Sequence, residues 1–137
     1  MKEDIVFPKV TGVSVAIARK PGLLGAFEWA AYLINKNDYP LTNVLISTKG
    51  YGHNQGEPQR TSVLRHLIEK MAPHTAAIIE VLDPGVFHLV NEFWVSYYIG
   101  DISKDIYDKK FLFLPETIID PNIIYIPELE LEGVLHG

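Results

Sequence analysis

The stretch that decides the fold is residues 86–99, VFHLVNEFWVSYYI, the longest extended run in the chain. Apolar side chains alternate along it, so one face carries Phe87, Leu89, Phe93, Val95, Tyr97 and Ile99. Only Asn91 interrupts that face, and a buried asparagine needs hydrogen-bond partners. We therefore predict a strand at the centre of the core, where the Asn91 amide caps loose backbone groups at a bulge or kink.

Shorter runs with the same alternation lie on both sides of this segment and are separated by turn residues. Residues 35–40, NKNDYP, form a strong turn, because Asn and Asp tolerate left-handed conformations and Pro ends strand pairing. About seven strands at spacings of roughly 10–15 residues are typical of an immunoglobulin-like β-sandwich. We therefore predict a single all-β domain over residues 1–137, with strands near residues 13–18, 27–35, 41–48, 76–82, 86–99, 109–114 and 123–126.

Residues 61–71 are compatible with either a strand or a helix. A helix near 62–72 would turn one apolar face to the core, formed by Val63, Leu64, Leu67, Ile68 and Met71. In a strand, alternate residues would share a face, beginning with Thr61, Val63, Arg65 and Leu67. The strand is favoured for the upstream half, and the alternative would change the fold class from all-β to α+β.

The composition is that of an ordinary globular domain. Hydrophobic residues make up 47% of the 137 residues and charged residues 21%, which excludes a disordered chain. The lack of cysteine excludes disulfides, thiolate metal sites and cysteine nucleophiles. The sequence has no signal-peptide core at its N-terminus and no run close to the roughly 18 apolar residues of a membrane span. We therefore expect a cytoplasmic protein without membrane contact.

Charge is distributed unevenly along the chain. The net charge is −5, and residues 116–137 carry five acids and no Lys or Arg, which leaves twelve acids and twelve bases elsewhere. We predict an acidic C-terminal tail over 116–137, in which Pro121 and Pro127 confine any strand to a sheet edge. An acidic tail and a body without a basic stripe disfavour nucleic-acid binding.

A polar cluster surrounds the glycine-rich loop at residues 49–59. The loop ends in Gly56-Glu57-Pro58 and so lacks the Gly-Lys-Ser/Thr of a phosphate-binding loop. The five histidines show no metal-ligand spacing, and Ser62 with His66 lacks a third catalytic member, so we expect no metal, cofactor or enzymatic activity. Guanidinium groups match carboxylates and phosphates, which predicts a candidate binding patch of Lys49, Tyr51, His53, Arg60, Arg65 and His66.

Several aromatic side chains fall outside the main apolar stripe. Runs 27–34 and 93–99 are apolar on both faces, so either the C-terminal tail or another subunit must cover their outer faces. Exposed Trp and Tyr mark interfaces, which predicts candidate interface aromatics at Tyr32, Trp94 and Tyr98. These features predict a non-enzymatic binding or assembly module that engages a protein partner or forms a homodimer.

Five segments together resemble a group of short bacterial proteins often labelled "phenylalanyl-tRNA synthetase subunit alpha". They are residues 29–35, 43–52, 61–66, 91–96 and 107–111. The label implies tRNA aminoacylation, but a class II synthetase holds ATP with paired arginines, and the last arginine here is Arg65. The resemblance therefore carries over no catalytic residue. It implies as an alternative function a translation accessory that contacts tRNA or an aminoacyl-tRNA synthetase through Lys49, His53, Arg60 and Arg65.

Overall fold

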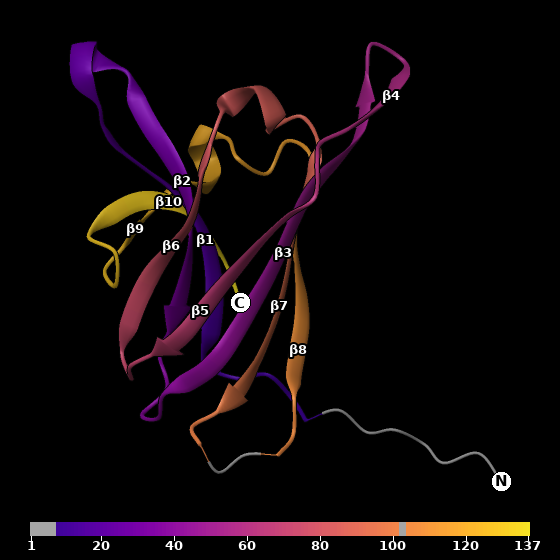
Figure 1. Ribbon diagram of the computed structural model, residues 1–137. Coiled ribbons are helices and arrows are strands. Elements are labelled where there is room, and N and C mark those ends of the chain that lie inside the picture. Colours follow the sequence, from indigo (N-terminus) through magenta and orange to yellow (C-terminus); the bar gives the residue numbers. More distant parts are fainter. Residues whose placement is uncertain (1–7, 102–103) are drawn as a thin grey trace, which may run out of the picture.

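The protein is a sandwich of two antiparallel β-sheets (Figure 1). The computed structural model describes residues 8–101 and 104–137, so the N-terminal residues for which we expect no signal peptide lie partly outside it. Sheet A has the strand order β6-β2-β1-β10-β9, and sheet B has the order β5-β3-β7-β8 with β4 beside the far half of β3. The ten strands of the described residues are β1 (Val13–Pro21), β2 (Phe27–Asn35), β3 (Leu41–Asn54), β4 (Glu57–Arg60), β5 (Leu64–Met71), β6 (Thr75–Leu82), β7 (Val90–Ile99), β8 (Tyr107–Phe113), β9 (Ile124–Ile126) and β10 (Leu131–His136).

This architecture confirms the predicted all-β sandwich. Taken together, β6-β2-β1 and β5-β3-β7-β8 are seven strands that pair as in an immunoglobulin-like domain. The three further strands are β4, β9 and β10. Short 3-10 helices at Leu23–Gly25, Pro84–Val86 and Asp120–Asn122 are the helical elements of the described residues, and none of them is long enough to cross a membrane.

The helix considered near residues 62–72 does not form, because this segment pairs with β3. Strands β4 and β5 follow β3 as the return arm of one long hairpin, whose turn at Gln55 and Gly56 has positive φ at both positions. The pairing register shifts by one residue between β4 and β5, so residues 61–63 form a bulge. The apolar residues of the supposed helical face are divided between the two faces of the sheet, and Leu67 is 64% exposed.

The core lies between the sheets and is centred on β7, as the alternation of residues 86–99 predicts. The strand begins only at Val90, however, since residues 84–86 form a 3-10 helix and residues 87–89 a turn. Phe93, Val95 and Tyr97 are almost fully buried, and Phe93 packs edge-on against Phe113 at 5.7 Å. Asn91 is buried, and its Nδ2 donates to the carbonyl oxygens of Val86 and Leu89 at 2.9 and 3.2 Å. The predicted capping role of the Asn91 amide is therefore confirmed.

The acidic segment 116–137, expected as a tail, contributes two strands to sheet A. β9 forms the edge, as its flanking prolines predict, but β10 lies inside the sheet between β1 and β9. Together with the turn between them, these strands pack against β1 and β2 on the outer face of sheet A. The resulting second apolar cluster consists of Ala16, Ala18, Tyr32, Ile34, Ile126, Leu129, Leu131 and Leu135. The C-terminal segment is thus the cover that the apolar outer face of β2 requires.

Candidate functional site

The outer face of sheet B carries exposed apolar side chains on adjacent strands. Strand register places Arg65, Ser47, Trp94 and Lys110 in one row and Leu67, Leu45, Ser96 and Asp108 in the next. Trp94 is 43% exposed and Leu45 is 45% exposed. We call this surface the Trp94 face, and it consists of Leu45, Ser47, Arg65, Leu67, Trp94, Ser96, Ile106, Asp108 and Lys110.

The Trp94 indole is held in place at the centre of this face by polar neighbours on β8. Its Nε1 donates a hydrogen bond to Oδ1 of Asp108, and Nζ of Lys110 lies 4.5 Å from the ring centroid. A cation over an aromatic face attracts the ring electrostatically. A shallow depression of about 400 Å³ next to the indole is lined by Leu45, Ser47, Arg65, Ser96, Ile106 and Asp108. A ring fixed in this way loses little conformational freedom when a partner covers it.

A buried carboxylate organises the neighbouring end of the sheet. The Glu92 side chain is only 6% exposed, and Nζ of Lys49 lies 3.7 Å from its Oε2. The hydroxyl of Tyr51 donates to Oε1 of Glu92 at 3.3 Å. Burial, and then the charge and hydrogen bonding of Glu92, raise the pKa of Tyr51 above its ordinary value. Lys49 and Tyr51 are therefore held by structural contacts of their own.

The bulge at residues 61–63 decides where the two arginines point. Arg60 and Arg65 are an odd number of positions apart, so a regular strand would place them on opposite faces. The extra residue in the bulge brings both arginines to the same face of the sheet. Arg60 lies opposite Tyr51 and Arg65 lies opposite Ser47, and these two partners on β3 share one face. Two hydrogen bonds between Thr61 and Gly50 fix the bulge. The backbone N–H of Thr61 donates to the carbonyl oxygen of Gly50, and the backbone N–H of Gly50 donates to Oγ1 of Thr61 at 2.7 Å.

The structure brings five of the six predicted patch residues to one side of sheet B. Lys49, Tyr51 and Arg65 lie on the sheet, and His53 and Arg60 line a depression on the β3–β4 hairpin with Tyr51. His66 lies apart from them, because it points between the sheet edges, where its Nε2 is 3.1 Å from Oε1 of Glu80 on β6.

The predicted interface aromatics lie on two different sheets. Trp94 and Tyr98 both point outward from β7, and Tyr98 borders a separate depression with Thr42 and Glu69. Tyr32 belongs to sheet A and packs against the C-terminal cluster. Sequence reasoning missed Leu45, Leu67, Ile106 and Lys110 as members of the Trp94 face. The alternation of β3 and β8 identifies their faces only once the pairing register is known.

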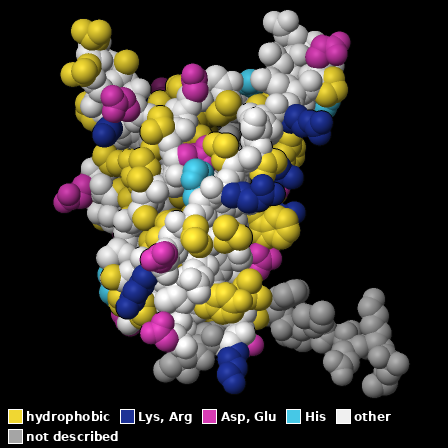
Figure 2. Space-filling view, in the orientation of Figure 1, with side chains coloured by type: hydrophobic (Ala, Val, Ile, Leu, Met, Phe, Trp, Pro, Cys, Tyr) yellow, Lys and Arg dark blue, Asp and Glu magenta, His cyan; other side chains and the backbone are white. Residues whose placement is uncertain are grey.

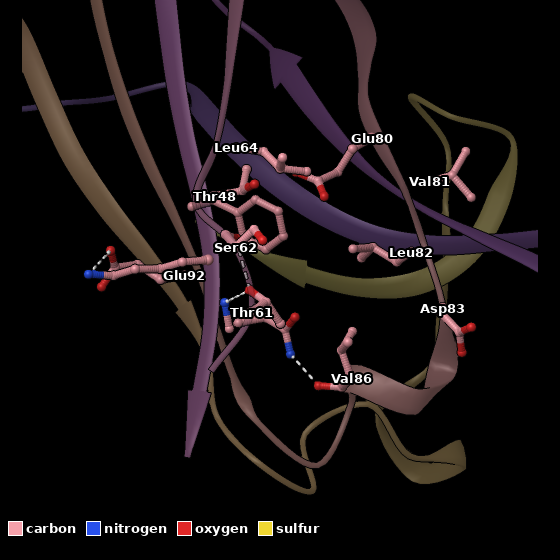
Figure 3. A pocket seen from close by; sticks show the side chains of 14 residues that line it. Thr48, Thr61, Ser62, Leu64, Glu80, Val81, Leu82, Asp83, Val86 and Glu92 are labelled. Atoms are coloured by element: carbon pink, nitrogen blue, oxygen red, sulfur yellow. Dashed lines mark hydrogen bonds and ion pairs between the residues drawn. The ribbon is translucent and has the colours of Figure 1, made fainter. Parts of the chain in front are cut away.

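A second cavity lies between the edges of the two sheets (Figure 3). Its volume is about 210 Å³, and it is bordered by β6, the 61–64 segment and the start of β7. Figure 3 shows Glu80 directed towards Leu64, whereas Glu92 points away from the cavity towards Lys49. Ligand pockets usually measure about 300–1,000 Å³, so this cavity is small for a ligand. The described residues also contain no cluster of three His, Asp or Glu side chains that could hold a metal ion.

Comparison of the chain with protein-family models, curated proteins and solved structures gives no match. The resemblance to short proteins with a synthetase label therefore stays a prediction. The surface of this chain is therefore the basis for its function, and the Trp94 face combines exposed aromatic, apolar and charged side chains.

Proposed function

We propose that this protein is a non-enzymatic binding module that engages a protein partner through the Trp94 face. The proposal rests on a difference in how the outer faces of the two sheets are covered. On sheet A, the chain's own C-terminal segment covers the apolar outer face of β1 and β2, while Ile78 and Val81 stay exposed on β6. On sheet B, Leu45, Leu67 and Trp94 remain between 43% and 64% exposed.

The composition of the Trp94 face supports this proposal. Protein interfaces are enriched in Trp and Arg and have an apolar centre with a polar rim. Trp94 lies at the centre here, and Arg65, Asp108 and Lys110 provide charges around it. Figure 2 shows Lys and Arg side chains next to hydrophobic ones along the right-hand side of the molecule, over sheet B.

The test compares one substitution on the Trp94 face with a matched substitution on the other sheet. Trp94→Asp and Val81→Asp both introduce a carboxylate at an exposed apolar position, and Val81 is 76% exposed on β6. Tagged proteins are incubated with lysate of the source cells, and retained proteins are cross-linked and quantified by mass spectrometry. We expect one defined partner, another protein or the chain itself, to be retained by the wild type and by Val81→Asp, and about tenfold less by Trp94→Asp. Equal capture by all three, or no capture, would contradict the proposal.

A translation accessory is the second candidate function, supported by the arginines of the same side. In the described part of the chain, no carboxylate lies within ion-pair distance of Arg60 or Arg65. These side chains are free to contact tRNA phosphates or an acidic surface of a synthetase. Binding of labelled tRNA at low salt, weakened by Arg60→Ala with Arg65→Ala, would support this function. Absence of tRNA binding at about 50 mM salt, where phosphate contacts are strong, would exclude contact with tRNA.

A further inference from the structure

We infer that the partner is a second copy of this chain, with the acidic β9–β10 turn of one copy docked on the Trp94 face of the next. The inference rests on the proposed function and names the occupant of the same face. It starts from the opposite charge of two patches on different sheets, the β9–β10 turn on sheet A and the Trp94 face on sheet B.

The β9–β10 turn presents unpaired acids next to exposed apolar side chains. Glu128 and Glu130 lie in this turn and are exposed, and among the described residues neither has an ion-pair partner. Glu132 differs from them, because Arg19 lies 3.3 Å from its carboxylate. Next to the turn, Ile124 is 50% exposed and Tyr125 is 61% exposed on the edge strand β9. This patch is therefore acidic and apolar together.

The Trp94 face has the complementary character. Arg65 and Lys110 lie on either side of Trp94 in one row of sheet B, and both are exposed. Asp108 is the one acid among the residues that define the face; it accepts the hydrogen bond of the Trp94 indole, and the two cations outnumber it. The face therefore offers two cations and an apolar depression to an incoming segment that carries carboxylates and apolar side chains. Charge complementarity of this kind selects partners and fixes their orientation.

The two patches cannot satisfy each other within one chain. The β9–β10 hairpin lies on the left of the molecule in Figure 1, whereas β7 and β8 lie on the right. Pairing two Trp94 faces in a symmetric dimer would bring Arg65 and Lys110 close to the same cations of the other copy, and like charges repel. Contact between unlike patches avoids this repulsion and gives a head-to-tail arrangement, which either closes into a ring or continues as a chain.

Two neutralising variants test the arrangement, because each removes one side of the contact. Glu128→Gln with Glu130→Gln changes only the turn, and Arg65→Gln with Lys110→Gln changes only the Trp94 face. The control for the turn variant, Glu116→Gln with Asp120→Asn, makes the same change in net charge outside the turn. Self-association of the full chain is measured by sedimentation velocity at about 50 mM and 500 mM salt, because exposed charges are strongly screened at the higher concentration.

We expect the wild type and the control to self-associate at low salt and to dissociate at high salt. Each neutralising variant alone should associate about tenfold more weakly, as expected for two lost ion pairs. An equimolar mixture of the two variants should form a 1:1 dimer that grows no further, because one intact turn meets one intact face. A wild type that stays monomeric, variants that associate like the wild type, or a mixture that does not recombine would overturn the inference. If a different protein is then captured through Trp94, the proposed function stands without it.

Discussion

Gly133 on β10 lies against β1 with no room for a side chain. A Cβ added to Gly133 would be 2.4 Å from the carbonyl oxygen of Ile17 and 2.6 Å from Cα of Ala18. Both are backbone atoms of the adjacent strand, so rotation of a side chain cannot relieve the contact. We predict that Gly133→Ala pushes β10 away from β1 and loosens the C-terminal cover of sheet A.

The magnitude follows from two opposing effects. Overpacking a well-packed site costs about 1–3 kcal/mol, and contact with backbone places Gly133→Ala near the upper end. Replacing Gly by Ala also restricts the unfolded chain, which stabilises the folded state by about 0.4–1 kcal/mol. The free energy of unfolding should therefore fall by about 2 kcal/mol.

Urea denaturation followed by tryptophan fluorescence measures this loss. Gly25→Ala is the control, because Gly25 has a φ of 78° and an added Cβ would meet no atom within 4 Å. Gly25→Ala isolates the cost of placing an L-residue in a left-handed conformation. This cost is about 1–2 kcal/mol, and we expect the lower end of that range at this exposed turn. A Gly133→Ala protein as stable as the wild type, or more stable than Gly25→Ala, would refute the steric reasoning.

Four further substitutions test the two faces of β7 and the pH dependence of stability. Asn91→Ala should lower the free energy of unfolding by about 2–3 kcal/mol in urea titrations, because two backbone carbonyls lose their donor; an unchanged midpoint would show that these bonds contribute nothing. Phe93→Ala should cost about 3–5 kcal/mol, and Trp94→Ala only about 1–1.5 kcal/mol, because these neighbours lie on opposite faces of β7; equal losses would contradict that assignment. Burial, and secondly the charge of Lys109, lower the pKa of His136 in the folded state. As the pH falls below about 6.5, the unfolded state therefore takes up a proton before the folded state does, and the free energy of unfolding of the wild type decreases. His136→Gln should lose less stability between about pH 7.5 and 5.5 in urea titrations, and an equal loss would exclude this role.

The sequence was sufficient to predict the sandwich because its decisive pattern is local. Alternation along residues 90–99 reports directly which side chains of β7 are buried, whereas residues 86–89, predicted as part of the same strand, precede it as the end of a 3-10 helix and a turn. β10 was not predictable in the same way. Its glycine at position 133 interrupts the apolar pattern, and the strand is defined by pairing with β1, more than a hundred residues earlier.

The candidate site shows the same division between local pattern and distant pairing. Alternation alone places Trp94 and Tyr98 on the outer face of β7. It cannot place Arg60 and Arg65 on one face, since this depends on the one-residue bulge between β4 and β5. Nor can it distinguish Tyr32 from Trp94, because only the course of the C-terminal segment decides which outer face is covered.

The position of β1 has a consequence for biosynthesis. β1 lies between β2 and β10, so one of its edges finds its partner only after Leu131–His136 has left the ribosome. Roughly 100 residues separate the end of β2 from the start of β10, and translation at about 5–20 residues per second takes about 5–20 seconds over that distance. During this interval the nascent hairpin of β1 and β2 carries an unpaired apolar edge, which is a template for pairing with other chains. Chains that are being synthesised on the same messenger RNA are therefore the neighbours with which the unpaired edge of β1 could most readily pair.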